Sequence, residues 1–261
     1  MFVRFFLAFA LALVASAWAQ SPAKIGVVLM HGKGGLPDGV IHELAMFLDS
    51  RGFVLANLEM PWSSRRDYDV DVPAGEKQVA DAVADVRKRG AAKVFIAGHS
   101  QGGLFALHMG GKLPVDGVVA IAPGGNVAGQ AFREKLGDSV RRAGDLVAAG
   151  KGSERQRFLD FEGARGTNPV ITTATNYLSW FDPEGAMNQM RAIRALDAKT
   201  PVLFIVPTND TPGLLRVKQA MFDALPRNPL TKLYEPEGTH LRAPTASREE
   251  IARWIAEVAS R

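Results

Sequence analysis

The chain of 261 residues contains no cysteine, which excludes thiol nucleophiles, thiolate metal ligands and disulfide bonds. It must therefore rely on its apolar core for stability, and a hydrophobic fraction of 47% is enough to build one. Blocks of one charge sign are also lacking. The chain has 31 Lys and Arg residues and 27 Asp and Glu residues. The basic residues are scattered along the chain, and no block of them alternates with aromatic residues. We therefore expect no nucleic-acid binding.

The chain has only one long apolar run, from Phe5 to Val14, and it is shorter than the roughly 20 residues of a bilayer span. The run follows the basic Arg4 and precedes the small-residue pattern of residues 17–19, as in a secretory signal peptide. We expect residues 1–19 to be such a peptide, cleaved after Ala19, and the mature protein to be periplasmic or secreted, without a stable membrane span. An uncleaved anchor is the alternative.

Cofactor motifs are lacking as well. The sequence has no H-E-x-x-H or other cluster with metal-ligand spacing. Two segments, GKGG (32–35) and GKGS (150–153), resemble parts of a phosphate loop, but Val27 and Asp145 stand where that motif needs its first glycine. The sequence therefore predicts no cofactor and no metal.

The chain does contain a regular alternation of strand and helix patterns. Continuous apolar runs predict strands at 24–32, 53–61, 93–98, 116–125, 201–210 and 231–238. Helical patterns follow at 39–52, 74–90, 101–109 and 248–259. Apolar strands joined by helices are typical of an α/β fold whose parallel sheet is covered on both faces. We expect a single domain over residues 20–261.

The alternation breaks between about residues 126 and 200. Apolar residues at helical spacing, from Phe132 to Val147, predict a helical insertion between the fourth and fifth strands. Three aromatic residues follow, and they can line a substrate pocket or simply pack the insertion onto the sheet: Tyr177, Trp180 and Phe181. For each residue taken alone, packing is the more common role.

One serine stands at a junction of strand and helix. The stretch VFIAGHSQGG (94–103) matches G-x-S-x-G, in which a sharp turn exposes the serine hydroxyl. Gly98 and Gly102 relieve the crowding of such a turn, and the helix start leaves the backbone N–H of Gln101 free. A plain tight turn is the alternative. We interpret Ser100 as a nucleophile.

With this turn, the HGKGG segment (31–35) and acid and histidine candidates in the order Ser, Asp, His, the chain resembles the α/β-hydrolase superfamily over nearly all of its mature length. The resemblance implies a compact fold with a mostly parallel sheet of about six strands and a helical cap insertion after the fourth. It also implies an activity like that of serine esterases and lipases.

The resemblance also assigns the partners of the serine. His240 follows the last strand, where the family carries its general base. Asp210, at the end of the fifth strand and about thirty residues earlier, takes the place of the orienting acid. Asp182, expected at a helix start in the insertion, is a weaker candidate for the acid. The remaining histidines are His31, His42, His99 and His108.

By the same analogy, the backbone N–H groups of Lys33 and Gln101 form the oxyanion hole, and glycines around Lys33 let the backbone approach a substrate. Lys33 departs from the apolar or aromatic residue common in the family. We expect its side chain to point to solvent, with attraction of an anionic substrate group as the alternative. Further candidates for the substrate pocket are His31, Gly32 and Trp62, with Arg65 and Arg66 in the next loop.

A serine nucleophile favours acyl transfer over dehalogenation or epoxide opening. We therefore expect hydrolysis of a small-molecule carboxylic ester, with a short or medium acyl chain, through an acyl-enzyme. Cleavage of amides, peptides or thioesters and acyl transfer are alternatives, as is a non-catalytic ligand-binding protein with this fold. No sequence pattern indicates an oligomeric state.

Overall fold

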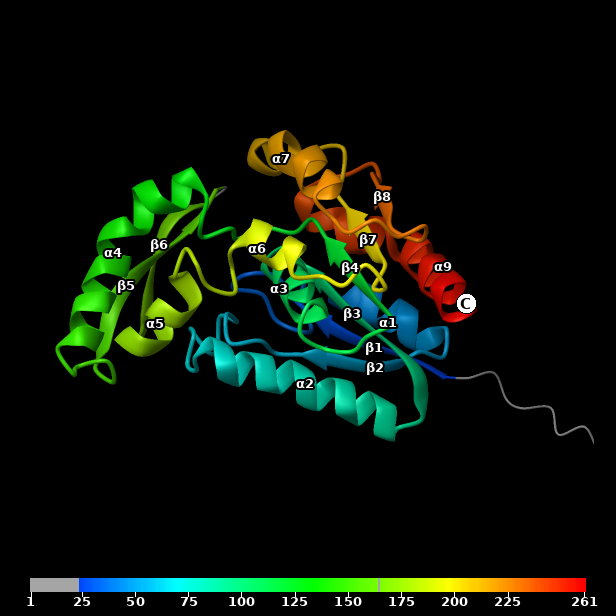
Figure 1. The fold of residues 1–261 in the computed structure, drawn as a ribbon, viewed down its shortest axis with the longest axis horizontal. Helices are drawn as coiled ribbons and strands as arrows, with labels where there is room; N and C mark the ends of the chain where they lie inside the picture. Colours follow the sequence, from blue (N-terminus) through cyan, green and yellow to red (C-terminus); the bar gives the residue numbers. More distant parts are fainter. Residues whose placement is uncertain (1–23, 164) are drawn as a thin grey trace, which may run out of the picture.

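A six-stranded sheet forms the centre of the molecule (Figure 1). The computed structural model describes residues 24–163 and 165–261, so the predicted signal peptide lies outside the described residues. In the order β2-β1-β3-β4-β7-β8, every pair of neighbouring strands is parallel. This confirms the predicted sheet. Its strands are β1 (Lys24–Met30), β2 (Val54–Leu58), β3 (Ala91–His99), β4 (Gly117–Ile121), β7 (Val202–Ile205) and β8 (Lys232–Tyr234).

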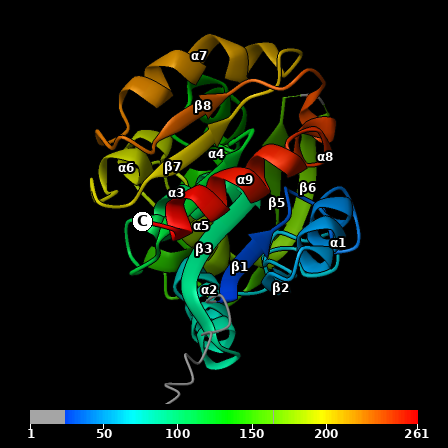
Figure 2. The ribbon, with the colours of Figure 1, turned by 90° about the vertical axis from the view of Figure 1, so that its right-hand side faces the viewer.

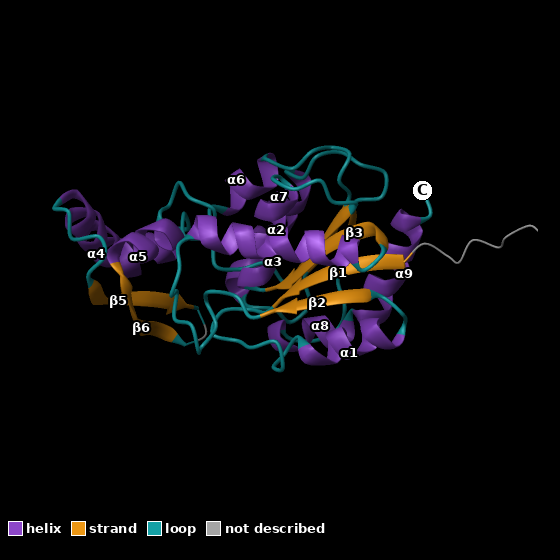
Figure 3. Ribbon diagram, turned by 90° about the horizontal axis from the view of Figure 1, so that it is seen from below, coloured by secondary structure: helices purple, strands orange, loops and turns teal. Residues whose placement is uncertain are grey.

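Helices cover both faces of this sheet (Figure 3). On one face lie α1 (His42–Ser50) and α9 (Arg248–Ala259), and on the other α2 (Val72–Lys88) and α3 (Gln101–Gly110). These four helices match the predicted ones to within a few residues. The sequence patterns do not predict α7 (Pro212–Asp223), because this surface helix buries only Leu214 and Met221. The short segments α6 (Gln189–Arg194), η1 (His240–Arg242) and α8 (Ala243–Ala246) are likewise without a sequence signal.

The insertion lies where the sequence predicts it, between β4 and β7, but the prediction that it is helical is wrong in part. It contains α4 (Gln130–Ala148) and α5 (Ala174–Phe181), and between them an antiparallel pair, β5 (Arg155–Glu162) and β6 (Gly166–Thr173). Figures 1 and 3 show it beyond one end of the sheet, where the carboxyl ends of the parallel strands lie, and in Figure 2, seen from the opposite end, β5 and β6 lie behind the sheet.

The two strands of the insertion escape sequence analysis for a physical reason. A half-buried strand is recognised by alternating apolar and polar residues. Here two of the buried positions hold polar residues, Asp160 on β5 and Thr172 on β6. Pro169 also interrupts the pattern of β6. The alternation is therefore present in burial but hidden in the sequence.

Trp180 anchors the insertion to the rest of the domain. Its ring lies 5.5 Å from that of Trp62, in the loop after β2, and 5.4 Å from that of Phe105, on α3, and both of these residues are buried. Its indole Nε1–H donates to the Val70 carbonyl at 2.8 Å. At Gly75 on α2, a Cβ atom would come within 2.9 Å of the Trp180 ring, so the helix and the indole are in close contact. The insertion therefore shares one core with the sheet.

The turn between β3 and α3 is the most crowded part of the backbone. Ser100 has φ 54° and ψ −118°, a backbone conformation that residues other than glycine rarely adopt. A Cβ atom on Gly98 would lie 2.2 Å from the Gly102 carbonyl oxygen, and one on Gly102 would lie 2.6 Å from the carbonyl oxygens of Met30 and His31. Only glycine fits at these two positions, since the obstructing atoms belong to the backbone.

We predict that Gly98→Ala lowers the free energy of unfolding by about 3 kcal/mol, because the added methyl group forces the turn open. Gly144→Ala is the matched control. Gly144 lies inside α4, and no described atom outside the adjoining helix backbone comes within 4 Å of the place that an alanine methyl group would take. Alanine there should raise the free energy of unfolding by about 0.5–1 kcal/mol. Urea unfolding of the two variants measures both values. Equal stability of the two variants would contradict the crowding argument.

Candidate active site

The predicted nucleophile sits where the chain changes direction across the sheet. The chain runs from β1 outward to β2 and then returns to β3 on the other side of β1. The loops after β1 and β3 therefore diverge and leave a crevice at the carboxyl ends of the strands. Ser100 follows β3, and Lys33 lies in the loop after β1.

Ser100, His240 and Asp210 form one hydrogen-bonded chain. His240 Nε2 lies 2.9 Å from Ser100 Oγ, and His240 Nδ1 lies 2.9 and 3.0 Å from the two carboxylate oxygens of Asp210. The Asp210 side chain is fully buried, and it accepts further hydrogen bonds from the N–H (2.6 Å) and hydroxyl (3.1 Å) of Thr211. A carboxylate on Nδ1 orients the imidazole so that Nε2 can accept the serine proton.

The last two strands of the sheet bring the acid and the histidine together. Asp210 follows β7 and His240 follows β8, and these two strands are neighbours. Beyond their ends, a β-bridge joins Asn209 to Thr239. The Asn209 N–H also donates to the Gly238 carbonyl at 3.0 Å. Backbone contacts therefore hold the two loops next to each other.

His99 supports His240 from behind, a role that the sequence analysis does not assign. Its Nε2–H donates to the His240 carbonyl at 2.9 Å, and the two rings are 4.9 Å apart. Burial, followed by the neighbouring His240, lowers the pKa of His99 to about 3. The imidazole is therefore neutral at ordinary pH, with one N–H to donate. In the sequence, the only indication of this role is that His99 directly precedes Ser100.

Two backbone N–H groups are free beside Ser100. Among the described residues, neither the Lys33 nor the Gln101 amide donates a hydrogen bond. The next two amides of the loop are used: Gly34 N–H donates to the Trp62 carbonyl at 2.9 Å, and Gly35 N–H to the Gly32 carbonyl at 3.0 Å. The Gln101 amide is the first in α3, where no intrahelical acceptor exists. Two free amides on adjacent loops can stabilise an oxyanion.

The other candidates in and beside this loop hold it in shape. The His31 ring accepts from the Met60 N–H at 3.0 Å and donates to the Gly32 carbonyl at 2.7 Å. Burial lowers the pKa of His31, which keeps the ring neutral for this pair of bonds. Trp62 is buried and donates to the His31 carbonyl at 3.0 Å. At Gly32 a Cβ atom would lie 3.1 Å from Ser100 Cβ, so this position must stay small.

The prediction that the Lys33 side chain points to solvent is wrong. Its Nζ donates to Asp160 Oδ1 at 2.5 Å and to the Phe161 carbonyl at 3.0 Å, and the side chain is only 14% exposed. The rings of Phe132 and Phe181 lie 5.1 and 5.9 Å from the ammonium. Sequence reasoning could not foresee this partner, because Asp160 lies on the hidden strand β5.

The aromatic candidates of the insertion are core residues. Tyr177 stacks between Phe158 and Phe181 at 4.4 and 4.3 Å and donates its hydroxyl to the Leu159 carbonyl at 2.6 Å. Trp180 is the anchor described above. Phe181 also borders the cavity between α4 and the end of α5.

Several other polar candidates lie apart from Ser100, His240 and Asp210. Asp182 follows the end of α5, not a helix start, and accepts from the Glu184 N–H at 2.9 Å. Arg65 and Arg66 form ion pairs within their own region of the surface, with Glu59 and with Asp69. His42 is exposed at the start of α1, and His108 pairs with Glu76 on the helical face.

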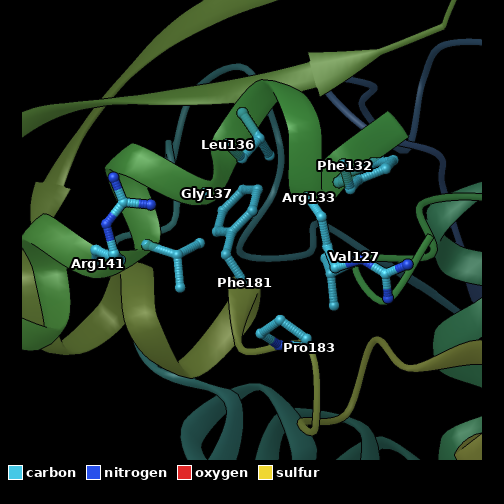
Figure 4. Close-up of a pocket in the computed structure, with 9 residues that line it drawn as sticks. Val127, Phe132, Arg133, Leu136, Gly137, Arg141, Phe181 and Pro183 are labelled. Atoms are coloured by element: carbon cyan, nitrogen blue, oxygen red, sulfur yellow. The ribbon is translucent and has the colours of Figure 1, made fainter. Parts of the chain in front are cut away.

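A cavity of about 210 Å³ opens between α4 and the end of α5. Figure 4 shows Phe181 rising from α5 toward α4, with Arg133 and Arg141 also at the cavity. Both arginines are exposed, and the remaining lining is almost wholly apolar: Val127, Phe132, Leu136, Gly137, Val140, Phe181 and Pro183. Two of these rings, Phe132 and Phe181, also flank the Lys33 ammonium. These two rings therefore lie between the cavity and the Lys33 side chain.

In the part of the chain that the structure describes, no three His, Asp or Glu side chains gather as a metal site would require. No described helix has the length and apolar character needed to cross a membrane.

Comparisons with known proteins agree with this architecture. A family model described as the alpha/beta hydrolase family matches residues 27–254, whereas curated protein sequences gave no match. The fold is similar to that of a monoacylglycerol lipase from Paleococcus ferrophilus, with a TM-score of 0.62, 20% identity, and 90% of this chain and 94% of that chain covered.

Two further solved structures share the fold, with similar TM-scores and sequence identities. For Est1E from Butyrivibrio proteoclasticus with bound ferulic acid, the TM-score is 0.62 at 16% identity, with 93% of each chain covered. For a structure described for two metagenome-derived lipolytic enzymes, LipS and LipT, the TM-score is 0.60 at 16% identity, with 92% of this chain and 95% of the matched chain covered. At such identities the likeness shows the fold alone. Because the family match spans nearly all of the described residues, the protein belongs to the alpha/beta hydrolase family.

Proposed function

We propose that the protein is a serine hydrolase that cleaves carboxylic esters through an acyl-enzyme. The observation that carries the proposal is the hydrogen-bonded chain from Asp210 through His240 to Ser100. The free amides of Lys33 and Gln101 lie beside it. A nucleophile, its base, an orienting acid and oxyanion donors are the four parts that acyl transfer needs.

In the proposed reaction, His240 Nε2 takes the hydroxyl proton as Ser100 Oγ attacks the ester carbonyl carbon. The carbonyl oxygen becomes an oxyanion and accepts hydrogen bonds from the two amides. His240 then gives its proton to the leaving alcohol, which departs as the acyl-enzyme forms. A water molecule, deprotonated by His240, cleaves the acyl-enzyme by the same steps, and Ser100 regains its proton. Asp210 stabilises the imidazolium in both halves.

The cavity between α4 and α5 supports an ester with a short or medium acyl chain. Apart from two exposed arginines its lining is apolar, and its volume of about 210 Å³ is modest, so a few methylene groups fill it. Structural neighbours described as a monoacylglycerol lipase and as lipolytic enzymes agree with such a substrate class. Amides, thioesters and acyl transfer would use the same triad, and no observation favours them over ester hydrolysis.

Ser100→Ala is expected to lower the hydrolysis rate of p-nitrophenyl esters by about 10⁴-fold or more, because the nucleophile is lost. Ser247→Ala is the control. The buried hydroxyl of Ser247 has no hydrogen-bond partner among the described residues, so its loss should change the rate by less than about twofold. The measurement is release of p-nitrophenol over acyl chains from acetate to decanoate. Turnover that survives Ser100→Ala would refute the proposed mechanism.

The same ester series tests the cavity. Val140→Trp fills space on the inner side of α4 and is expected to lower kcat/KM for octanoate by about tenfold or more, since several methylenes lose their burial. The acetate ester should change by less than about twofold. Val147→Trp, on the same helix but exposed and outside the cavity, is the control. Equal losses for acetate and octanoate in Val140→Trp would argue against an acyl pocket here.

We also propose that the protein is exported to the periplasm or beyond, on the basis of the leader pattern in residues 1–19. The chain expressed in a Gram-negative host is expected to appear in the periplasmic or culture fraction with Gln20 as its first residue. Replacing three leucines or phenylalanines of the apolar run with charged residues should keep it in the cytoplasm at full length. Full-length protein in the membrane fraction would support the anchor alternative instead.

A further inference from the structure

A buried polar network joins the two residues whose amides are proposed to bind the oxyanion. The carboxylate of Asp160, on β5, accepts from Lys33 Nζ at 2.5 Å through Oδ1 and from the Tyr68 hydroxyl at 3.1 Å through Oδ2. Gln101 Nε2 in turn donates to the Tyr68 oxygen at 3.3 Å. We call these four residues (Lys33, Tyr68, Gln101 and Asp160) the Asp160 network.

The hydrogen bonds of the network have a definite direction. A tyrosine has one proton, and the charged carboxylate of Asp160 is the stronger and nearer acceptor for it than the Gln101 amide oxygen at 3.4 Å. The Tyr68 oxygen is then free to accept from Gln101. Burial, followed by the charge of Asp160, raises the pKa of Tyr68 well above its usual value. The phenol therefore stays protonated, so Gln101 donates to Tyr68, and Tyr68 and Lys33 both donate to Asp160.

The charge of Lys33 is neutralised within the Asp160 network. Two of its three N–H donors bind Asp160 and the Phe161 carbonyl, and the ammonium also faces the rings of Phe132 and Phe181. With the side chains of Lys33 and Asp160 only 14% and 8% exposed, the two charges neutralise each other away from solvent. Lys33 is thus engaged by the protein itself, which argues against a role in attracting an anionic substrate.

Tyr68 is held in a strained backbone conformation. Asp67 and Tyr68 have φ values of 48° and 56°, a region that non-glycine residues rarely occupy. The insertion fixes this turn from two sides, since Thr172 Oγ1 and Asn176 Nδ2 both donate to the Tyr68 carbonyl, at 2.6 and 3.2 Å. The Ile171 N–H donates to the Asp67 carboxylate at 2.9 Å. Strain maintained by so many contacts marks a position whose geometry matters.

From these contacts we infer that Asp160 and Tyr68 are positioning residues for the oxyanion hole, and that the insertion sets the geometry of both oxyanion donors through them. Asp160 fixes the loop of Lys33 by its ion pair, and it fixes the first turn of α3 through Tyr68 and the Gln101 side chain. This inference rests on the proposed function. It gives the insertion a part in the chemical step besides its part in the acyl pocket.

The test compares Tyr68→Phe and Asp160→Asn with a matched control, Glu250→Gln. Tyr68→Phe removes only the hydroxyl and keeps the ring beside Trp180 and Phe181. Glu250 has the same side-chain exposure as Asp160, 8%, and is also paired with a lysine, Lys232, but lies on α9 outside the network. It therefore reports what the loss of a buried carboxylate does through stability alone.

Steady-state kinetics on p-nitrophenyl acetate and the second-order rate constant for labelling by a fluorophosphonate are measured for each variant. The phosphoryl oxygen of the probe occupies the oxyanion hole, so labelling reports its geometry without turnover. Tyr68→Phe and Asp160→Asn are expected to lower kcat and the labelling rate constant by about 10- to 100-fold, because displaced donors stabilise the transition state less well. KM should change by less than about twofold, and Glu250→Gln should leave all three values within about twofold.

The double variant adds a second check. Because both residues act through one chain of hydrogen bonds, Tyr68→Phe combined with Asp160→Asn should lower kcat by much less than the product of the two single effects. If either single variant fails to fold, as judged by circular dichroism, the other still tests the inference. Folded variants with kcat and labelling within about twofold of the parent would overturn it, and so would losses in kcat equalled by Glu250→Gln.

Failure of the proposed function has a different signature. If the parent protein is labelled at Ser100 but does not hydrolyse esters, the esterase proposal fails, and the labelling rate constants still decide the inference. If the parent is neither labelled nor active, while Ser100→Ala behaves identically, both the function and the inference are refuted.

Discussion

The crowded turn at Ser100 is the constraint on which the rest of the site depends. To expose the hydroxyl, the chain must reverse within a few residues between β3 and α3, with Ser100 at φ 54°. Such a turn is possible only because Gly98 and Gly102 carry no side chain in contact with the backbone. The same reversal leaves the Gln101 amide without an intrahelical partner. The proposed nucleophile and one proposed oxyanion donor are therefore two results of one backbone geometry, which the parallel sheet supports by holding β1 and β4 on either side of β3.

The sheet places the remaining parts with little further specification. In a parallel sheet all carboxyl ends lie on one edge, so the loops after β7 and β8 bring Asp210 and His240 to the same side as Ser100. The insertion also leaves the sheet from this edge, after β4. It shares the core through Trp180, Trp62 and Phe105, so its position relative to the crevice is fixed by tight aromatic packing. A rigidly attached insertion is able to orient groups at the crevice, whereas a loosely attached lid could only cover them.

The parts of the structure that the sequence predicts are those with strong local signals. Continuous apolar runs identify the six strands, and the spacing of serine, acid and histidine follows from their places after β3, β7 and β8. The β5–β6 pair and the buried Lys33 are not predicted, and both have the same cause. Asp160 occupies an inward position of β5, which hides the strand from any pattern of hydrophobicity. Its partner Lys33 lies 127 residues away in the chain, and a charged residue in a glycine-rich loop is by itself typical of the surface.

A polar residue at that inward position needs a physical explanation, because stability does not provide one. Bringing a lysine and a carboxylate out of water costs several kcal/mol per ion, and well-packed apolar residues of the same volume are often at least as stable. What an ion pair with hydrogen bonds adds is direction. Apolar contacts tolerate rotation and small shifts, whereas the bonds of Asp160 to Lys33 and Tyr68 fix angles as well as distances. Oxyanion donors have to be held to a fraction of an ångström and within about 10–20°. A buried ionic network between the insertion and the two loops that carry the proposed donors meets that requirement, and an apolar contact in its place would not.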